Sequence, residues 1–464
     1  MGIKKGDIIE LEITGMAFGG KAIAKVDGFA VFVDKAVPLD RVRARIVKKK
    51  KSFAEAAMVE IIEASPYRIN PPCEYSGYCG GCKWQFIEYE RQLYYKQQHV
   101  KEALEHIGFL KDITIHPVIP SQSIFGYRNK MEFSCSDKKW LMPSDFTAGE
   151  KNAGFALGLH VPGTFDKVLD IKACLLQPEK GNLILNDVKE FMQNSGAQPY
   201  GLRSHEGFWR FLMLRNSGAY GSWMVNIITS AEDNKVVKPL SEMLVQKYSD
   251  IVSVINNITS SKAGVAVGEY EKVLAGSSYI KDKIGAFEFK ISANSFFQTN
   301  TKGAQILYNK VKEFAQLSGK ETVIDLYSGT GTIPIYLSAD AAEITGIEIS
   351  ESAVSDAKNN CIINGISNCT FITGDIKNSL SKIENKPDVL IIDPPRVGMH
   401  KDVVKQVIDM APERIVYVSC NPATLARDLF ILKDYFDVIQ VQPVDMFPHT
   451  FHIESVTKLE KKRF

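Results

Sequence analysis

The chain has 464 residues, which is more than one ordinary domain, so we expect two or three domains. Hydrophobic residues make up 45% and charged residues 24% of the sequence, the composition of a soluble globular protein. No run of roughly eighteen apolar residues predicts a membrane span. The N-terminus is charged and then alternating, unlike a secretory signal, so we expect a cytoplasmic location and no contact with a membrane.

Charge is distributed unevenly along the chain. The net charge is only +2, but residues 1–62 contain twelve Lys or Arg against eight Asp or Glu, including four consecutive lysines from Lys48 to Lys51. A local basic excess on a near-neutral chain is typical of a module that binds a polyanion. A solvated turn between two strands would give the same pattern, and composition alone leaves both interpretations open.

Short strands are expected in the first 62 residues. Alternating or apolar runs cover 7–14 and 28–33, with a glycine turn between them, and the run 41–47 places three arginines on one strand face. Several short strands with glycine turns and a basic face predict a small barrel of the oligonucleotide-binding type. Their order and composition resemble the TRAM domain, a small RNA-binding barrel found on RNA-modifying enzymes.

A cluster of cysteines follows a proline-rich segment at 65–72. Three of the eight cysteines are Cys73, Cys79 and Cys82. In a reducing compartment, clustered cysteines more often hold a metal or perform chemistry than form disulfides. A long amphipathic helix is expected over 84–110, interrupted by Gly108, and mixed strands and helices over 117–286.

The pattern becomes regular from Lys320 to the C-terminus. Short β-rich runs alternate with helical stretches, which predicts a parallel sheet with helices on both faces. These runs are 322–327, 343–349, 370–374, 388–393 and 414–420.

A cofactor site is expected at the carboxyl ends of these strands. The first strand ends in a turn that contains Gly329 and Gly331, but Pro334 occupies the place of the third glycine of a dinucleotide fingerprint. Glu348 ends the second strand, where it can accept hydrogen bonds from ribose hydroxyls, and Asp375 follows the third, where it can meet an adenine amino group. A turn without phosphate-binding features and two such acids suit S-adenosylmethionine better than NAD, although a generic α/β turn with surface acids fits the same residues.

Two further motifs follow the next two strands. Asp393-Pro-Pro-Arg396 fixes the backbone at the site, and it contains neither the aromatic residue typical of amino methyltransferases nor the cysteine of RNA cytosine methyltransferases. Cys420, in Ser419-Cys-Asn-Pro422, ends the following strand. A cysteine at the edge of a cleft can be activated, whereas one in the core is inert.

Five separated motifs stand in family order and together resemble the RNA uracil-5-methyltransferases, which act on 23S ribosomal RNA or transfer RNA. The resemblance covers the whole chain. The motifs are 295–300 with Gln298, 325–329, 393–396, 419–422 and Phe447-Pro-His-Thr-Phe-His-Ile-Glu454.

The resemblance implies a role for each motif. Cys420 would be the nucleophile and Glu454 the base that removes the proton from carbon 5. Carbon 5 of uracil is too weak a nucleophile by itself, and a thiolate that adds to carbon 6 makes it reactive. The implied cofactor contacts are Gln298, Tyr327, Glu348 and Asp393, with Asp375 as a fifth.

The cysteine cluster also has a counterpart in the family. Cys73, Cys79 and Cys82 supply three thiolates, and we select Cys174 as the fourth; the spacing alone fits zinc or an iron–sulfur cluster. Family members with this spacing carry a [4Fe–4S] cluster, so the resemblance implies one here. Because some relatives lack these cysteines, we expect a structural or RNA-positioning role for the cluster.

We therefore expect an α/β multidomain protein with an N-terminal OB-like barrel of the TRAM type, an α+β central domain with the iron–sulfur loop, and a C-terminal Rossmann-like methyltransferase domain. The expected divisions are 1–62, then 63–83 with 117–286, then 84–116 with 287–464. The favoured substrate is 23S RNA, with transfer RNA as the alternative, and we expect a monomer without a protein partner. A methyltransferase for another base, such as RNA cytosine, and an RNA-binding assembly factor that has lost catalysis are the competing hypotheses.

Overall fold

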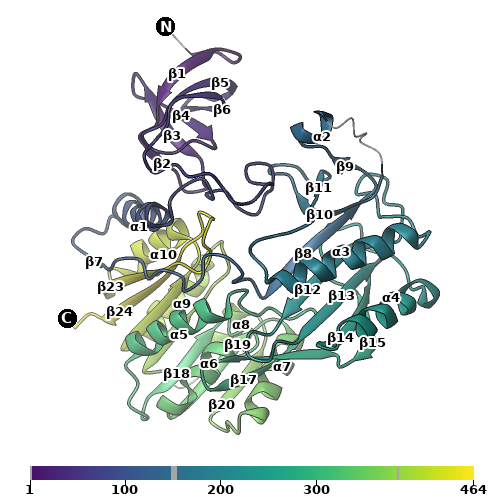
Figure 1. The fold of residues 1–464 in the computed structure, drawn as a ribbon. Coiled ribbons are helices and arrows are strands. Elements are labelled where there is room, and N and C mark those ends of the chain that lie inside the picture. The colour runs from purple at the N-terminus through teal and green to yellow at the C-terminus, as the bar shows by residue number, and fades with distance from the viewer. Residues whose placement is uncertain (1–2, 148–153, 384–385, 464) are drawn as a thin grey trace.

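The N-terminal sheet has six strands, is drawn at the top of Figure 1, and shares its apolar core with residues of the segment that follows it and of α1. The structure is a computed structural model that describes residues 3–147, 154–383 and 386–463. The strand order is β1-β5-β6-β4-β3-β2. The strands are β1 (Ile8–Glu12), β2 (Gly15–Met16), β3 (Ala22–Val26), β4 (Phe29–Asp34), β5 (Arg41–Lys49) and β6 (Phe53–Glu63).

Strand β5 alternates as the sequence predicts, with Val42, Ala44 and Ile46 buried and the arginines exposed between them. Two of these arginines are ion-paired with neighbouring strands: Arg41 with Glu10 on β1 at 3.3 Å, and Arg43 with Glu60 on β6 at 2.7 Å. Much of the basic charge that the sequence places on this face is therefore neutralised within the sheet.

The central sheet has eight strands in the order β15-β14-β13-β12-β8-β10-β11-β9. Helices α3 (Glu179–Asn194) and α4 (Asn234–Lys247) lie against one face of it (Figure 1) and share its apolar core. The short helix α2 (Pro143–Thr147) follows β9. The strands are β8 (Lys130–Ser136), β9 (Lys139–Trp140), β10 (Ala156–His160), β11 (Val168–Asp170), β12 (Trp209–Asn216), β13 (Trp223–Thr229), β14 (Ile251–Ile258) and β15 (Tyr270–Gly276).

The C-terminal sheet has eight strands in the order β20-β19-β18-β21-β22-β24-β23-β7. The first five are parallel, as predicted, but β24 is antiparallel to both β22 and β23, so the sheet is mixed. The strands are β18 (Thr322–Leu326), β19 (Glu343–Glu348), β20 (Cys369–Thr373), β21 (Val389–Ile392), β22 (Arg414–Ser419), β23 (Phe436–Val444), β24 (Glu454–Lys461) and β7 (Thr114–Ile115).

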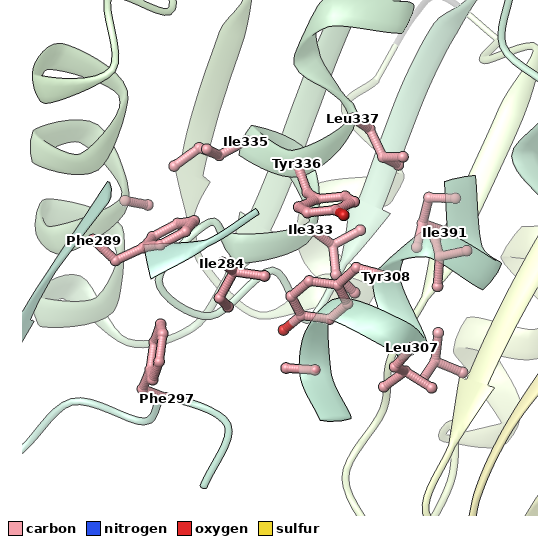
Figure 2. Close-up of a cluster of buried hydrophobic side chains, with 14 of the residues drawn as sticks. Ile284, Phe289, Phe297, Leu307, Tyr308, Ile333, Ile335, Tyr336, Leu337 and Ile391 are labelled. Atoms are coloured by element: carbon pink, nitrogen blue, oxygen red, sulfur yellow. The ribbon is translucent and has the colours of Figure 1, made fainter. Parts of the chain in front are cut away.

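Helices cover both faces of the C-terminal sheet, and two apolar clusters fill the space between. Figure 2 shows part of the first cluster, where the hairpin β16 (Tyr279–Ile284) and β17 (Phe287–Ser292) meets α5 and α6. The helices are α5 (Thr301–Ala315), α6 (Thr332–Leu337) with the 3₁₀ turn η1 (Ser338–Asp340), α7 (Glu351–Ile363), α8 (Ile376–Leu380), α9 (Lys401–Met410) and α10 (Pro422–Leu432).

Helix α1 (Tyr89–His106) belongs spatially to the C-terminal sheet although it precedes the central one. It lies beside α10 (Figure 1), and the next strand, β7, pairs in parallel with β23. The sequence predicts this helix but places its start at Trp84, which instead is buried in an irregular segment and donates from Nε1 to the carbonyl of Gly20 at 3.2 Å. Among the residues that the structure describes, no helix has the length and apolar character needed to cross a membrane.

Candidate active site and cysteine cluster

The strand register brings the two candidate catalytic residues together. Ser419 at the end of β22 pairs with Ser455 of antiparallel β24. Extending this register by one residue places Cys420 opposite Glu454, and opposed residues of antiparallel strands have Cα atoms about 5 Å apart. The antiparallel insertion of β24, which the sequence does not reveal, thus joins two motifs that are 34 positions apart in the chain.

The electrostatic environment of this pair is unusual. Glu454 is 6% exposed, and burial together with the nearby Asp393 raises its pKa well above the ordinary value. Burial also raises the pKa of the Cys420 thiol, to about 12, with the Glu454 and Asp393 charges adding to the effect. The Arg396 guanidinium acts in the opposite direction and lowers the pKa of both groups. Perturbed groups in close proximity are typical of a reaction centre.

The turn after β18 has the conformation that its glycines predict. Gly329 and Gly331 have φ angles of 53° and 77°, and Tyr327 reaches 66° although it is not glycine. Strain of this kind in a side-chain-bearing residue is often found at binding sites. The Gly329 amide donates to Glu348 Oε2 at 3.1 Å, and the Ser350 amide donates to Oε1 at 2.9 Å, so the Glu348 carboxylate is held rigidly beside the turn.

Three of the predicted cofactor residues line one cavity of about 400 Å³. Tyr327, Glu348 and Asp375 contribute to its wall, with His400 and Val403 of the α9 region opposite. The carboxylates of Glu348 and Asp375 offer hydrogen-bond acceptors, and Tyr327 offers an aromatic ring. A nucleoside with hydroxyl and amino donors fits this set of groups.

The remaining two predicted contacts lie outside that cavity wall. Gln298 is half-buried in the loop before α5, and its carbonyl accepts from Asn129 Nδ2 at 2.8 Å, which ties this loop to the central sheet. Asp393 follows β21, where partial burial raises its pKa to about 7. The Thr332 hydroxyl, to which the sequence assigns no role, is hydrogen-bonded to Tyr308 at 2.9 Å.

Asp325, within the motif 325–329, is a further candidate site residue that its sequence pattern does not distinguish. It is 1% exposed, and neither carboxylate oxygen has a hydrogen-bond partner within the described residues. Burial and the charges of Asp393 and Glu348 raise its pKa well above the ordinary value. An orphaned buried carboxyl at the end of β18 is evidence for a polar ligand at this edge of the sheet.

The loop that leads into Glu454 is held by groups far away in the sequence. Lys96 of α1 contacts Asp445 Oδ1 at 2.6 Å, with both side chains fully buried, and donates to the Phe447 carbonyl at 3.0 Å. The His449 carbonyl accepts from the amides of Lys83 and Trp84, at 2.9 and 3.0 Å. The loop is therefore fixed both by α1 and by the segment that directly follows Cys82.

The two histidines of this loop are uncharged at neutral pH. Burial is the main reason that the pKa values of His449 and His452 are lowered to about 4. His449 stacks on the Phe125 ring at 4.3 Å and contacts Gln92 through Nδ1, so it shapes the loop.

Cys73, Cys79, Cys82 and Cys174, which the sequence analysis groups together, line one cavity of about 350 Å³ beside the central sheet. Burial raises the pKa of each thiol, to about 11 for Cys79 and about 12 for Cys82, and the charges of neighbouring thiols add to the effect for Cys79, Cys82 and Cys174. Within residues 3–147, 154–383 and 386–463, no group of three or more His, Cys, Asp or Glu side chains is arranged to hold a metal ion.

Comparison with known proteins identifies the family. Residues 265–462 match the family model described as tRNA (Uracil-5-)-methyltransferase, and residues 3–59 match the TRAM domain. A protein of Chlorobaculum tepidum named as an uncharacterized RNA methyltransferase is 44% identical, with 99% of this chain and 97% of that protein covered. The chain belongs to the RNA (uracil-5-)-methyltransferase family.

Two further relatives agree with this assignment. An RNA methyltransferase of Bacteroides thetaiotaomicron, also named uncharacterized, is 42% identical, covering 96% of this chain and all of that protein (100%). The crystal structure of Pyrococcus abyssi tRNA (uracil-54, C5)-methyltransferase in complex with S-adenosyl-L-homocysteine has a TM-score of 0.76 and 27% identity, covering 97% of this chain and 100% of that one. The predicted enzyme class and the predicted N-terminal TRAM domain are both confirmed.

Proposed function

We propose that this RNA methyltransferase transfers a methyl group from S-adenosylmethionine to carbon 5 of a uridine in 23S ribosomal RNA. The observation that supports the proposal is the β22–β24 register, in which Ser419 pairs with Ser455, so that Cys420 and the buried Glu454 follow at the adjacent position. These are the two groups that the reaction requires, since carbon 5 needs a nucleophile on carbon 6 and a base for its proton.

The Cys420 thiolate adds to carbon 6 of the uracil, and the electron pair of the 5,6 double bond moves toward carbon 5. S-adenosylmethionine, when bound, supplies an electrophilic methyl group to that carbon. Glu454, in its ionised form, then takes the proton from carbon 5, the double bond re-forms, and the Cys420–carbon 6 bond breaks to return the thiolate. Arg396 favours the ionised form of both side chains.

Five residues are proposed to hold the cofactor. Tyr327, Glu348 and Asp375 line the cavity that fits its adenosine part. In this proposal Glu348 accepts from the ribose hydroxyls and Asp375 from the adenine amino group, while Gln298 and Asp393 contact the methionine part. Asp375 also accepts from the Asn378 amide at 3.3 Å as the N-cap of α8, which fixes the orientation of its carboxylate.

We further propose that Cys73, Cys79, Cys82 and Cys174 hold a [4Fe–4S] cluster. A four-iron cluster is larger than a single ion, so its thiolate ligands lie farther apart than those of a single metal ion, and all four cysteines line one cavity. The Gly81 amide donates to Cys79 Sγ at 3.3 Å, a contact that stabilises a thiolate. Iron and sulfide analysis after anaerobic purification tests this, with Cys174→Ser expected to lower both contents and Cys135→Ser, an isolated buried thiol, expected to preserve them.

The choice of 23S RNA rests on the combination of a TRAM domain with a cysteine cluster, which is more typical of the ribosomal enzymes than of those for transfer RNA. In this account the chain is a cytoplasmic monomer whose domains comprise 1–62 as an OB-like barrel, 63–83 with 117–286, and 84–116 with 287–464. The packing of α1 on α10 and the pairing of β7 with β23 support the discontinuous division.

Nucleoside analysis of methylated transcripts tests the substrate. We expect the protein and S-adenosylmethionine to produce 5-methyluridine in a 23S RNA transcript, and we expect Cys420→Ala, with the neighbouring Asn421 intact, to produce none. 5-Methyluridine in transfer RNA alone would keep the mechanism and overturn the substrate. A 5-methylcytidine product would overturn the base assignment, and binding of both RNA classes without methylation would favour the non-catalytic hypothesis.

A further inference from the structure

A separate cavity of about 620 Å³ lies on the face of the central sheet opposite α3 and α4. Residues of β12 alternate between the two faces: Leu212 and Leu214 join the core under the helices, whereas Phe211 and Met213 form a small cluster on the other side. Phe211 is part of the cavity wall, together with His160, Phe165, Arg203, His205 and Lys262. None of these residues belongs to the reaction centre or to the cysteine cluster.

The walls of this cavity are organised by Arg210, which is 2% exposed. Its guanidinium donates to the carbonyls of Thr259, Ser261 and Ala263, at 3.0, 2.6 and 2.8 Å, and so fixes the loop that carries Lys262. The ring of Tyr200 lies 4.3 Å from the same guanidinium. A buried arginine that satisfies three loop carbonyls indicates that the cavity is pre-formed.

The groups that face the cavity suit a nucleotide. Phe165 is 67% exposed, and Arg203 lies 5.8 Å from its ring. Arg203 is paired with Asp166, whereas Lys262 has no ion-pair partner among the described residues. His160 contacts Ser134 through Nε2 at 2.9 Å, and its buried Nδ1 has no partner in the described part of the chain. An exposed aromatic ring with adjacent cations is the combination that binds an unstacked base and its phosphate.

The cavity is connected to both other sites through the central sheet. Strand β8 begins at Lys130, next to Asn129, which holds the Gln298 loop, and it reaches the cavity at Ser134. From Lys130, beside the Gln298 loop, to Ser134 is about 13 Å along the strand, and single-stranded RNA covers such a length within a few nucleotides. On the neighbouring strand β10, the carbonyl of His160 accepts from the amide of Gly80, between Cys79 and Cys82, at 2.9 Å.

We propose that this cavity binds an unpaired nucleotide of the substrate RNA, distinct from the uridine that is methylated and a few nucleotides away from it. The base stacks on Phe165, and its phosphate contacts Lys262 and Arg203. The inference rests on the proposed function, because it assumes an RNA that is held with its target uridine at Cys420. If so, the central sheet contributes to the selection of the substrate RNA by binding a nucleotide that is not itself methylated.

The experiment compares the double variant Phe165→Ala/Lys262→Ala with the control Lys180→Ala/Leu183→Ala, which removes an exposed lysine and an exposed apolar side chain from α3 on the other face. RNA affinity is measured in a Cys420→Ala background, by filter binding to 23S and transfer RNA transcripts, so that binding is observed without catalysis. We expect the cavity variant to weaken binding of the preferred transcript about tenfold, that is by about 1.4 kcal/mol, and the control to bind like the parent.

Steady-state methylation by the cavity variant with Cys420 intact provides the second measurement. We expect KM for RNA to rise about tenfold with kcat and cofactor affinity unchanged. Unchanged RNA binding, or a loss of kcat at constant KM, would overturn the proposal. A failure of this inference can be distinguished from a failure of the proposed function. If the proposed function is wrong, the native protein produces no 5-methyluridine, whether or not the cavity variant loses RNA affinity.

Discussion

Replacing Lys96 by methionine should destabilise the catalytic part of the chain strongly. Lys96 and Asp445 are fully buried and 2.6 Å apart, and the same ammonium group donates to the Phe447 carbonyl. Without Lys96 the Asp445 carboxylate keeps, among the described residues, two donors: the Tyr89 hydroxyl at 2.9 Å and the Phe447 amide at 3.0 Å. Leaving a buried charge without its counter-ion costs about 3–5 kcal/mol.

Calorimetric unfolding measures this effect, because it separates the transitions of a multidomain chain. For a domain of roughly 200 residues the expected fall in Tm is about 6–20 °C. Lys96→Met/Asp445→Asn removes both charges and should recover at least half of the loss. Lys101→Met, in an exposed pair with Glu105 on the same helix, should change stability by less than about 1 kcal/mol. A Lys96→Met protein within about 2 °C of the native Tm, or a double variant as unstable as the single one, would refute the reasoning.

Three other substitutions have defined outcomes. Burial raises the pKa of Asp393 to about 7, so the folded chain holds a proton that the unfolded chain releases near pH 4. The free energy of unfolding should therefore fall as pH rises between these two values, by at most about 1.4 kcal/mol per pH unit. Urea unfolding from pH 5 to 8 should show a shallower slope for Asp393→Asn, and an identical slope would contradict this. Gly331→Ala should lower the free energy of unfolding in urea by about 1–3 kcal/mol and weaken cofactor binding, because its Cβ would lie 2.8 Å from an aromatic ring at a φ of 77°. Gly319→Ala, at a φ of 89° with open space around it, should lower the free energy of unfolding by less. Equal losses for the two variants would exclude the clash as the cause. Arg396→Met removes the cation that lowers the pKa of Cys420, so the rise of the methylation rate with pH should move to higher pH, and a slower reaction with an unshifted pH profile would assign Arg396 another role.

The strands of the C-terminal sheet are predictable from the sequence because hydrophobic runs, helices and turn glycines alternate regularly there. The runs 322–327, 343–349 and 414–420 each agree with an observed strand to within one residue. What the sequence does not contain is the antiparallel placement of β24, since strand pairing depends on tertiary packing and not on the local pattern. Family resemblance implies the roles of Cys420 and Glu454, but their proximity follows from the strand register, which the sequence does not predict.

Long-range pairs account for the remaining differences. The partner of Lys96 lies 349 positions away, and no local charge pattern marks it. The sequence predicts a basic face for the arginines on β5, but Glu10 and Glu60 on the two adjacent strands pair with two of them. The sequence also predicts a helix that starts at Trp84, whose indole instead contacts the carbonyl of Gly20 in the N-terminal sheet. In each case the deciding contact comes from another part of the chain.

Covalent trapping with 5-fluorouridine tests the central claim most directly. Fluorine on carbon 5 cannot leave as a proton, so after methyl transfer Glu454 has nothing to remove, and the bond between Cys420 and carbon 6 persists. With S-adenosylmethionine and a 23S RNA transcript that contains 5-fluorouridine, the account predicts an adduct that survives denaturation and whose RNA-linked peptide contains Cys420. Cys420→Ala should form none. An adduct on another residue, or active methylation of normal RNA without any trapped adduct, would contradict the proposed chemistry.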